Sequence, residues 1–253
     1  MRYLVFGDVH GNAPALSAVL ADAGRRGYDA AIFLGDLIGY YPYPTEALDM
    51  VRSLDPFVAI RGNHDNLLLA LAAGADPAAA DEDPTVVEVV GRHLEVLAEA
   101  DRAYLGSLPM GARHDGWAAS HGGFRRPFDY LLTIAEAQDQ LEHLPVPVGL
   151  VGHTHLPRAH VSVANGEERL WRMIDFGESH RSYRVPPRAT AFLNPGSVGQ
   201  PRDGNPRAAY AVFDAPRRLF EVHRVPYDVA TVAQRTRRLG YPERLATRLL
   251  VGR

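Results

Sequence analysis

The chain has 253 residues, of which 46% are hydrophobic and 23% are charged, and its formal net charge is −3. These values suit a globular α/β protein with a sizeable core, and they exclude a disordered chain or one with the overall positive charge typical of nucleic-acid binding. There is no cysteine, which excludes disulfides, thiolate metal sites and a cysteine nucleophile. All 27 basic residues are arginine, so a lysine-dependent phosphate loop and Schiff-base chemistry are excluded as well.

Three strand–loop–helix units are predicted at the start of the chain. Apolar runs at residues 3–6, 30–34 and 57–60 are typical of buried strands, and a polar loop and then a helical pattern follow each of them. This alternation predicts a parallel sheet with right-handed crossovers. The first run is too short for a signal peptide and no stretch is long and apolar enough to span a bilayer, so we expect a cytoplasmic protein with no membrane partner.

The middle of the chain is predicted to be mainly helical. Residues 74–84 are rich in alanine, aspartate and proline and predict an insertion, either a solvated excursion or a lid over the neighbouring loop. Residues 85–100 then predict one long amphipathic helix. Two further strands are predicted at 116–120 and 146–151, and each ends in a loop that contains histidine.

The last part of the chain predicts a second, antiparallel sheet. Its expected strands cover residues 159–163, 169–174, 191–193, 208–213 and 219–225. The arginine-containing segment 177–188 is predicted to be a loop, and residues 228–239 and 242–250 are predicted to be short helices. No linker interrupts the sequence, so we expect one domain over residues 1–253.

Polar side chains follow five of the predicted strands. Because ligands bind at the carboxyl ends of strands in open α/β sheets, these side chains are candidates for a common site. Oxygen and imidazole donors without thiolates suit a pair of Mn, Fe or Zn ions. A carboxylate can bridge two ions and Asp36 stands alone in its loop, so it is the natural bridge. The candidates are Asp8 with His10, Asp36, Asn63 with His64, His121, and His153 with His155.

The order of these motifs resembles the calcineurin-like metallophosphoesterases. Asp-x-His, Gly-Asp, Gly-Asn-His-Asp, a lone His and Gly-His-x-His follow one another between Asp8 and His155. The stretch 194–202 resembles the bacterial and archaeal phosphodiesterase branch of this superfamily. The resemblance implies an α/β fold, a two-sheet α/β sandwich flanked by helices, with a dinuclear metal site at the strand ends.

The resemblance also implies a role for each motif residue. His64 would be the general acid that protonates the leaving oxygen, while a metal-bridging hydroxide would be the nucleophile. The cofactors would be two divalent metal ions, with Mn preferred and Fe, Zn, Mg and Ni as alternatives. The first ion would be held by Asp8, His10, Asp36 and His155, and the second by Asp36, Asn63, His121 and His153.

The expected activity is hydrolysis of small phosphodiesters or nucleotides. Phosphoprotein phosphatases of this superfamily carry an Asp-Arg pair shortly after Gly-Asp, but here Leu37-Ile38-Gly39-Tyr40 follows, which leaves open what orients His64. Three alternatives remain, namely a phosphomonoesterase, including a phosphoprotein phosphatase, a non-catalytic metal-binding scaffold, and an enzyme that cleaves nucleic acid. Candidate substrate-binding residues are Asn12, Arg61 and Arg202.

Other residues have less specific interpretations. Tyr40 and Tyr41 either stack on a base of the substrate or pack the loop. His93 lacks metal-ligand spacing and is interpreted as a surface or core histidine. The arginine-rich residues 235–248 are interpreted as a solvated helix face, with a nucleic-acid partner as the alternative.

Overall fold

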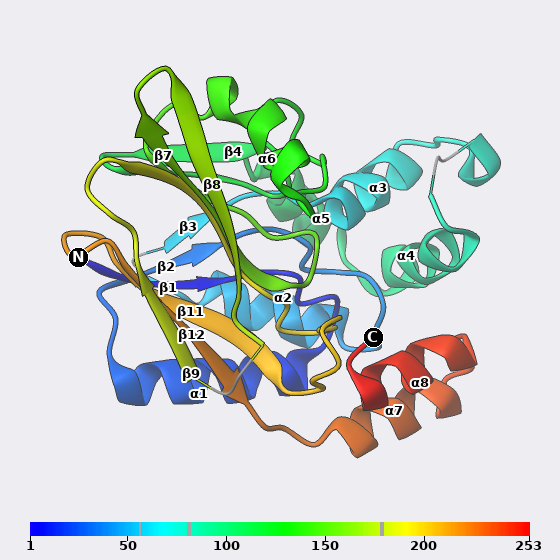
Figure 1. Cartoon of the computed structure of the whole chain (residues 1–253). Helices are drawn as coiled ribbons and strands as arrows, with labels where there is room; N and C mark the ends of the chain where they lie inside the picture. Colours follow the sequence, from blue (N-terminus) through cyan, green and yellow to red (C-terminus); the bar gives the residue numbers. More distant parts are fainter. Residues whose placement is uncertain (56, 80–81, 178–179) are drawn as a thin grey trace.

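Two six-stranded sheets face each other, and helices cover their outer faces (Figure 1). The structure is a computed structural model that describes residues 1–55, 57–79, 82–177 and 180–253. This architecture confirms the predicted two-sheet α/β sandwich flanked by helices. Within the described ranges, no helix combines the length and the apolar character needed to cross a bilayer.

The first sheet combines a parallel half with an antiparallel half. Its spatial order is β3 (Phe57–Ala59), β2 (Ala30–Phe33), β1 (Arg2–Phe6), β11 (Ala208–Asp214), β12 (Leu219–Val225) and β9 (His180–Arg184). The strands β1, β2 and β3 are parallel, as predicted, whereas β11 pairs antiparallel with β1. The carboxyl ends of the three parallel strands therefore lie at the same edge of the sheet.

The second sheet mixes both strand orientations as well. Its spatial order is β4 (Gly111–His114), β5 (Trp117–Ser120), β6 (Val148–Leu150), β10 (Ala189–Pro195), β7 (Pro157–Asn165) and β8 (Glu168–Asp175). Here β5, β6 and β10 are parallel to one another, and the other pairs are antiparallel. The prediction of a purely antiparallel second sheet is therefore wrong.

Two strands that were predicted for the second sheet belong to the first. The chain leaves β10 and crosses to the first sheet, where β11 pairs with the open edge of β1 and β12 pairs with β11. Pairing covers an edge of β1 that would otherwise expose unsatisfied backbone groups. Apolar alternation identifies a strand but does not specify its partner, which explains the error.

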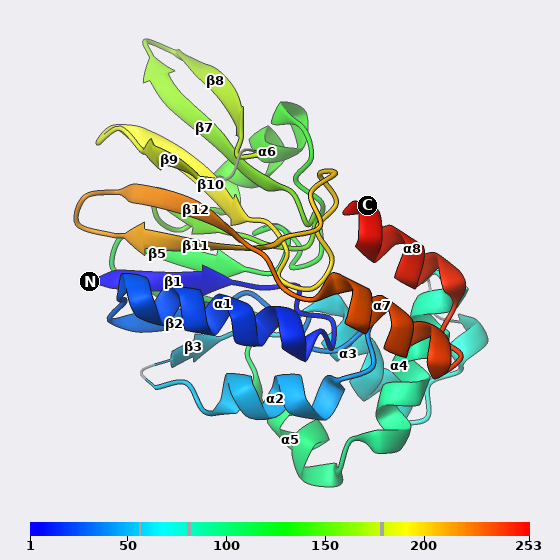
Figure 2. The same cartoon turned by 90° about the horizontal axis from the view of Figure 1, so that it is seen from below.

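The helices lie outside the sheets. Figure 2 shows α1 and α2 along the outer face of β1–β3, while α3, α4, α7 and α8 gather beyond the carboxyl ends of these strands. The helices are α1 (Ala13–Arg26), α2 (Pro44–Arg52), α3 (Asn63–Ala72), α4 (Pro84–Val96), α5 (Glu99–Ser107), α6 (Ile134–Gln140), α7 (Val229–Arg238) and α8 (Glu243–Val251).

Two further predictions of local structure need correction, and both interpretations of the segment 74–84 stay open. Residues 85–100 do not form one helix, because Leu97 is extended and the Asp101 carboxylate accepts a hydrogen bond from Ala98 N that begins α5. The predicted loop 177–188 contains β9, which pairs with β12, and residues 178–179 lie outside the described part. The segment 74–84 contains a short 3₁₀ helix (Pro77–Ala79), and residues 80–81 lie outside the described part.

The core has layers that match the sheets and helices. Alternate residues of β1 point in opposite directions, so Leu4 and Phe6 pack against the helices while Tyr3 and Val5 pack against the second sheet. A smaller cluster that includes Phe192 and Ala137 lies between the second sheet and α6. This packing fixes the two sheets face to face and brings the carboxyl ends of β1, β2, β5 and β6 together.

Candidate active site

The loops at these strand ends hold an unusual backbone conformation. Among the described residues, six non-glycine residues have positive φ, and five of them are predicted metal ligands. Each such residue costs about 1–3 kcal/mol, and it persists only where its surroundings hold it in place. The loop after β1 is held in this way, since Asp8 N donates to Gly35 O (2.9 Å). The five ligands have φ values of 52° (Asp8), 52° (His10), 58° (Asp36), 66° (His153) and 60° (His155).

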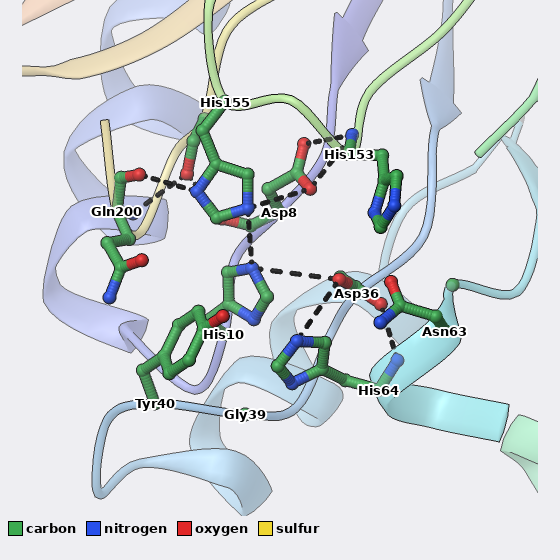
Figure 3. Close-up of polar contacts among 12 residues, drawn as sticks. Asp8, His10, Asp36, Gly39, Tyr40, Asn63, His64, His153, His155 and Gln200 are labelled. Carbon is green, nitrogen blue, oxygen red and sulfur yellow. Dashed lines mark hydrogen bonds and ion pairs between the residues drawn. The ribbon is translucent and has the colours of Figure 1, made fainter. Parts of the chain in front are cut away.

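The structure brings the predicted metal ligands together in two neighbouring groups (Figure 3). In the first group, donor atoms of Asp8, His10 and His155 lie within 4.8 Å of one another. In the second group, donor atoms of Asp36, His121 and His153 lie within the same limit.

The carboxylate of Asp36 lies between these two groups. Its Oδ2 is 3.3 Å from His121 Nε2 and 3.7 Å from His10 Nε2. Asn63 joins the second group, because its Oδ1 is 3.1 Å from His121 Nε2. This placement suits a bridging carboxylate, and a wider residue than glycine at position 62 would collide with it, since a Cβ there would lie 2.0 Å from Asp36 Oδ1.

Three imidazole rings are oriented by backbone carbonyl groups. Nδ1 of His10 lies 3.2 Å from Ile38 O, that of His155 lies 2.6 Å from Gln200 O, and that of His121 lies 2.7 Å from Leu34 O. A carbonyl oxygen can only accept, so each Nδ1 carries a proton, and Nε2 keeps a lone pair wherever the ring is neutral.

The Nε2 atoms of His10 and His155 face each other. His10 Nε2 and His155 Nε2 are 3.0 Å apart, and both rings are buried. Burial lowers the pKa of both imidazoles well below the usual value, so both are neutral near pH 7. Two neutral acceptors at this separation repel each other unless a cation lies between them, and the donor set therefore fits a metal ion.

The buried carboxylates have opposite pKa shifts. Burial raises the pKa of Asp8 to about 6, and the neighbouring Asp36 carboxylate adds to this shift. Burial acts in the same direction on Asp36, but His121 and His64 outweigh it and hold the pKa of Asp36 well below its usual value. Burial lowers the pKa of His121, but the charge of Asp36 outweighs it and raises that pKa to about 9. The positive charge of the protonated His121 ring compensates the negative charge of Asp36, as a bound cation would.

Ring packing orients His64, the residue whose orientation the sequence left open. Its backbone N donates to Asp36 Oδ1 (2.9 Å), and its ring packs edge-on against His10 and Tyr40 at centroid distances of 4.6 and 4.9 Å. Its Nδ1 is buried and has no hydrogen-bond partner among the described residues. His64 Nε2 lies 3.9 Å from Asp36 Oδ2, which is beyond hydrogen-bond distance, so among the described residues no aspartate forms a hydrogen bond to the ring.

The loop that packs on His64 is itself fixed from the core. His93 is fully buried, as one of its two interpretations predicted, and its Nδ1 accepts a hydrogen bond from Gly39 N (3.2 Å). Gly39 has φ of 140°, and a Cβ there would lie 2.9 Å from His64 Nδ1 and 2.5 Å from His10 Nδ1. Only glycine permits this approach of the backbone to both rings.

Two residues that were not predicted to have a role hold the site loops. The Asp65 carboxylate accepts hydrogen bonds from the backbone N–H groups of Gly62, Asp36, Leu37 and Ile38 at 2.9–3.2 Å. Ser197 Oγ donates to Asp8 O (2.8 Å) and so ties the loop after β10 to the loop after β1. The signal for Asp65 was present in the Gly-Asn-His-Asp motif, whereas the signal for Ser197 lay in the stretch 194–202.

The three predicted substrate-binding residues have different surroundings. Asn12 is buried and caps α1, and its amide donates to Gly199 O and Tyr227 Oη. The Arg61 guanidinium contacts the sulfur of Met110 at 3.3 Å. Neither of them lines the cavity beside the metal-ligand groups. Arg202 lines this cavity, and its Nη2 donates to Tyr40 Oη and Gln200 Oε1, each at 3.1 Å.

The cavity has a volume of about 210 Å³ and includes residues from distant parts of the chain. Tyr40 lies in its wall and is only 7% exposed, whereas Tyr41 is fully buried and packs the loop. Tyr130 stacks on His153 at 4.0 Å, and Glu82 Oε1 accepts a hydrogen bond from Asn63 Nδ2 (3.2 Å). No sequence pattern marked Tyr130 or Glu82, because neither belongs to a strand-end motif.

The family comparison agrees with this geometry. Residues 1–218 match the model of the calcineurin-like phosphoesterase superfamily domain, and the chain therefore belongs to this superfamily. The resemblance predicted from the strand-end motifs is thus confirmed.

Individual relatives match almost the whole chain. A metallophosphoesterase from Sphaerobacter thermophilus is 33% identical, with 100% of this chain and 99% of that chain covered and a TM-score of 0.84. Protein MJ0912 of Methanocaldococcus jannaschii is 28% identical over 98% of this chain and 97% of that protein. Protein PH1004 of Pyrococcus horikoshii shares the fold at 21% identity, with 100% and 98% covered and a TM-score of 0.76.

Proposed function

We propose that the protein is a metal-dependent phosphodiesterase that acts on small phosphodiesters or nucleotides. The observation that carries the proposal is the pair of buried donor groups with the Asp36 carboxylate between them, and with His64 and Arg202 beside them in one cavity. Superfamily membership supports phosphoester hydrolysis in general, and the choice of a diester is the finer part of the proposal.

The residues present fit two divalent metal ions. Asp8, His10, Asp36 and His155 would hold one ion, and Asp36, Asn63, His121 and His153 would hold the other. When bound, such ions would neutralise charge on the phosphate and would lower the pKa of water, so that hydroxide is available as the nucleophile. Mn is our first choice, because carboxylate, amide and imidazole ligands accept it without thiolates, and Fe, Zn, Mg and Ni are the alternatives.

The protein's own residues have two further tasks. Arg202 donates hydrogen bonds to the substrate phosphate, with its guanidinium oriented by Tyr40 and Gln200. His64 gives a proton to the leaving oxygen as a general acid. Burial lowers the pKa of His64 while Asp36 opposes this shift, and an anionic substrate beside the ring favours the protonated form that the reaction needs.

A comparison of diester and monoester substrates tests the proposal. Protein that has been stripped with a chelator and reloaded with Mn is expected to hydrolyse bis(p-nitrophenyl) phosphate at least about tenfold more efficiently than p-nitrophenyl phosphate. Exclusive monoester turnover would favour the phosphomonoesterase alternative instead. No turnover of either ester with Mn, Fe, Zn, Mg or Ni would favour a non-catalytic scaffold.

A further inference from the structure

Three arginines line the same cavity, although only one of them belongs to a recognised motif. Arg202 follows β10, whereas Arg244 and Arg248 lie on α8, one helical turn apart on the same face. Helix α8 lies beyond residues 1–218 that match the superfamily model. The arginine-rich end of the chain is therefore not only a solvated helix face, because Arg244, Leu245 and Arg248 of α8 line the cavity. Figure 2 shows α8 beyond the carboxyl ends of β1–β3.

The helix is anchored so that these guanidinium groups stay at the cavity. Leu245 and Leu249 are buried in the core beneath α8, and Leu245 O accepts a hydrogen bond from Tyr41 Oη (3.4 Å). Arg244 pairs with Asp83, the residue that caps α4. Arg248 Nε donates to Arg253 O (2.8 Å).

Positive charge in the cavity is only partly compensated. Among the described residues, no Asp or Glu side chain lies within ion-pair distance of Arg202 or Arg248, so Asp83 is the only acidic side chain that pairs with any of the three arginines. Burial lowers the pKa of Arg248, and the charge of Arg202 lowers it further. An anion that binds between these two neighbouring guanidinium groups reduces the repulsion between them.

A single phosphodiester does not account for so much positive charge. A phosphodiester carries one negative charge. The positive charge of the proposed metal pair is larger than the negative charge of Asp8 and Asp36, and the remainder already neutralises the phosphodiester. The guanidinium groups of Arg202 and Arg248 are additional, even though Glu82 and Asp83 contribute negative charge to the same cavity. A substrate that carries further phosphate groups would match the surplus.

We propose that Arg202, Arg244 and Arg248 form an anion subsite that binds phosphate in the leaving portion of the substrate, so that the substrate class is a nucleoside or dinucleoside polyphosphate. This inference rests on the proposed function and narrows its substrate. In the reaction, the oxygen of water forms a bond to the attacked phosphorus and the water releases one proton to solvent, while the P–O bond to the leaving phosphate breaks. The leaving phosphate keeps the electron pair, and the proton from His64 goes to its oxygen.

Binding of inorganic triphosphate tests the subsite without any turnover. Calorimetry on metal-free protein would compare the wild type with R248A and with R248K, which keeps the charge. The matched control is R238A, because Arg238 is exposed on the neighbouring helix α7 and does not line the cavity. We expect R248A to weaken binding at least tenfold, R248K to weaken it less, and R238A to stay within twofold. No binding to the wild type, or equal binding to wild type and R248A, would overturn the subsite.

Turnover then tests the substrate class. With Mn-loaded protein, we expect R248A to lower the ratio of kcat/KM for ATP to kcat/KM for bis(p-nitrophenyl) phosphate at least tenfold, while R238A leaves the ratio unchanged. An equal loss on both substrates would assign Arg248 a structural role and overturn the inference, although the diesterase proposal would survive. If neither compound is hydrolysed with any metal, the proposed function fails, and triphosphate binding still decides whether the subsite exists.

Discussion

The two sheets contribute different chemistry to the same site. The oxygen donors Asp8, Asp36 and Asn63 all follow strands of the first sheet, whereas His121, His153 and His155 follow strands of the second. Each sheet alone offers an incomplete set, and His153 N donates to the Asp8 carboxylate across a sequence separation of 145 residues. The candidate centre therefore exists only where the sheets meet.

This difference teaches that sheet packing and metal binding are coupled. The apolar layer between the sheets contains residues such as Val5 and Ile32 from the first sheet and Leu150 and Leu193 from the second. It holds the two donor groups within reach of each other. In return, ions that bind only the folded arrangement stabilise that arrangement by mass action. The strand ends where the two sheets meet, with the donor residues that follow them, form a seam between the sheets. Substitutions at this seam should therefore affect metal content and stability together, while substitutions elsewhere should affect stability alone.

The largest effect is expected from Asp36→Asn. The amide keeps the shape of the side chain but removes the negative charge that both donor groups share, so metal content should fall below two ions per chain and kcat/KM should fall by at least about 10³-fold. Metal analysis of the purified protein and turnover of the diester measure the two effects. Asp115→Asn, an exposed aspartate in the β4–β5 turn, is the matched control. Full occupancy of both metal positions in Asp36→Asn would contradict the bridging role.

The next effect is expected from His64→Ala. Loss of a general acid should lower kcat about 10²–10⁴-fold for an ester with a poor leaving group and much less for a p-nitrophenyl ester, whose leaving oxygen needs no proton. Metal content should stay at the wild-type value, because His64 is outside the proposed ligand set. His143→Ala, at the half-exposed His143 beside Glu142, is the control. An equal loss with both leaving groups would show that His64 does not supply the proton.

A smaller effect is expected from Gly39→Ala. The added Cβ meets the rings of both His10 and His64, and φ at this position is 140°. We expect a loss of about 1–3 kcal/mol in the free energy of unfolding, together with weaker metal binding. Gly74→Ala separates the two causes, because Gly74 also has positive φ (89°) but has no atom within 4 Å of an added Cβ. Equal metal affinity in the two variants would show that contact with the rings is unimportant.

Much of the fold and most of the candidate site could be predicted from the sequence, since both depend on local pattern. Short apolar runs such as residues 3–6 identify buried strands, and a parallel sheet places the loops after them at one edge. The meeting of Asp8 with Asp36 follows from that rule. The family resemblance then predicted that His153 and His155 join them, and the structure places them there. Their roles as ligands stay predictions.

The remaining features depend on tertiary contacts that local pattern does not encode. The pairing of β11 with β1 depends on which sheet edge is open. The break at Leu97 depends on burial of that side chain and on the hydrogen bond to Asp101. Arg244 and Arg248 looked like ordinary charges of a solvated helix, because only the packing of α8 over the strand ends turns them toward the cavity.

The smallest effect is expected far from the seam, at Asp22 on α1. Burial raises the pKa of this carboxylate, but hydrogen bonds from Arg26 and Tyr210 outweigh it and lower the pKa to about 2. A lowered pKa in the folded protein stabilises it above the ordinary value near 4, and the gain disappears as the pH falls toward 2. The carboxylate is partly exposed, so the gain is only about 1 kcal/mol.

Asp22→Asn should therefore lose about 1 kcal/mol in the free energy of unfolding at pH 6 and much less of it at pH 2.5. Urea denaturation at the two pH values measures the difference. Because Asp22 binds Tyr210 of β11 on the helix-covered side of the first sheet, metal content and diester turnover at pH 7 should not change. A change in metal content would contradict the separation between the seam and the rest of the first sheet, because it would show that packing of α1 reaches the donor groups.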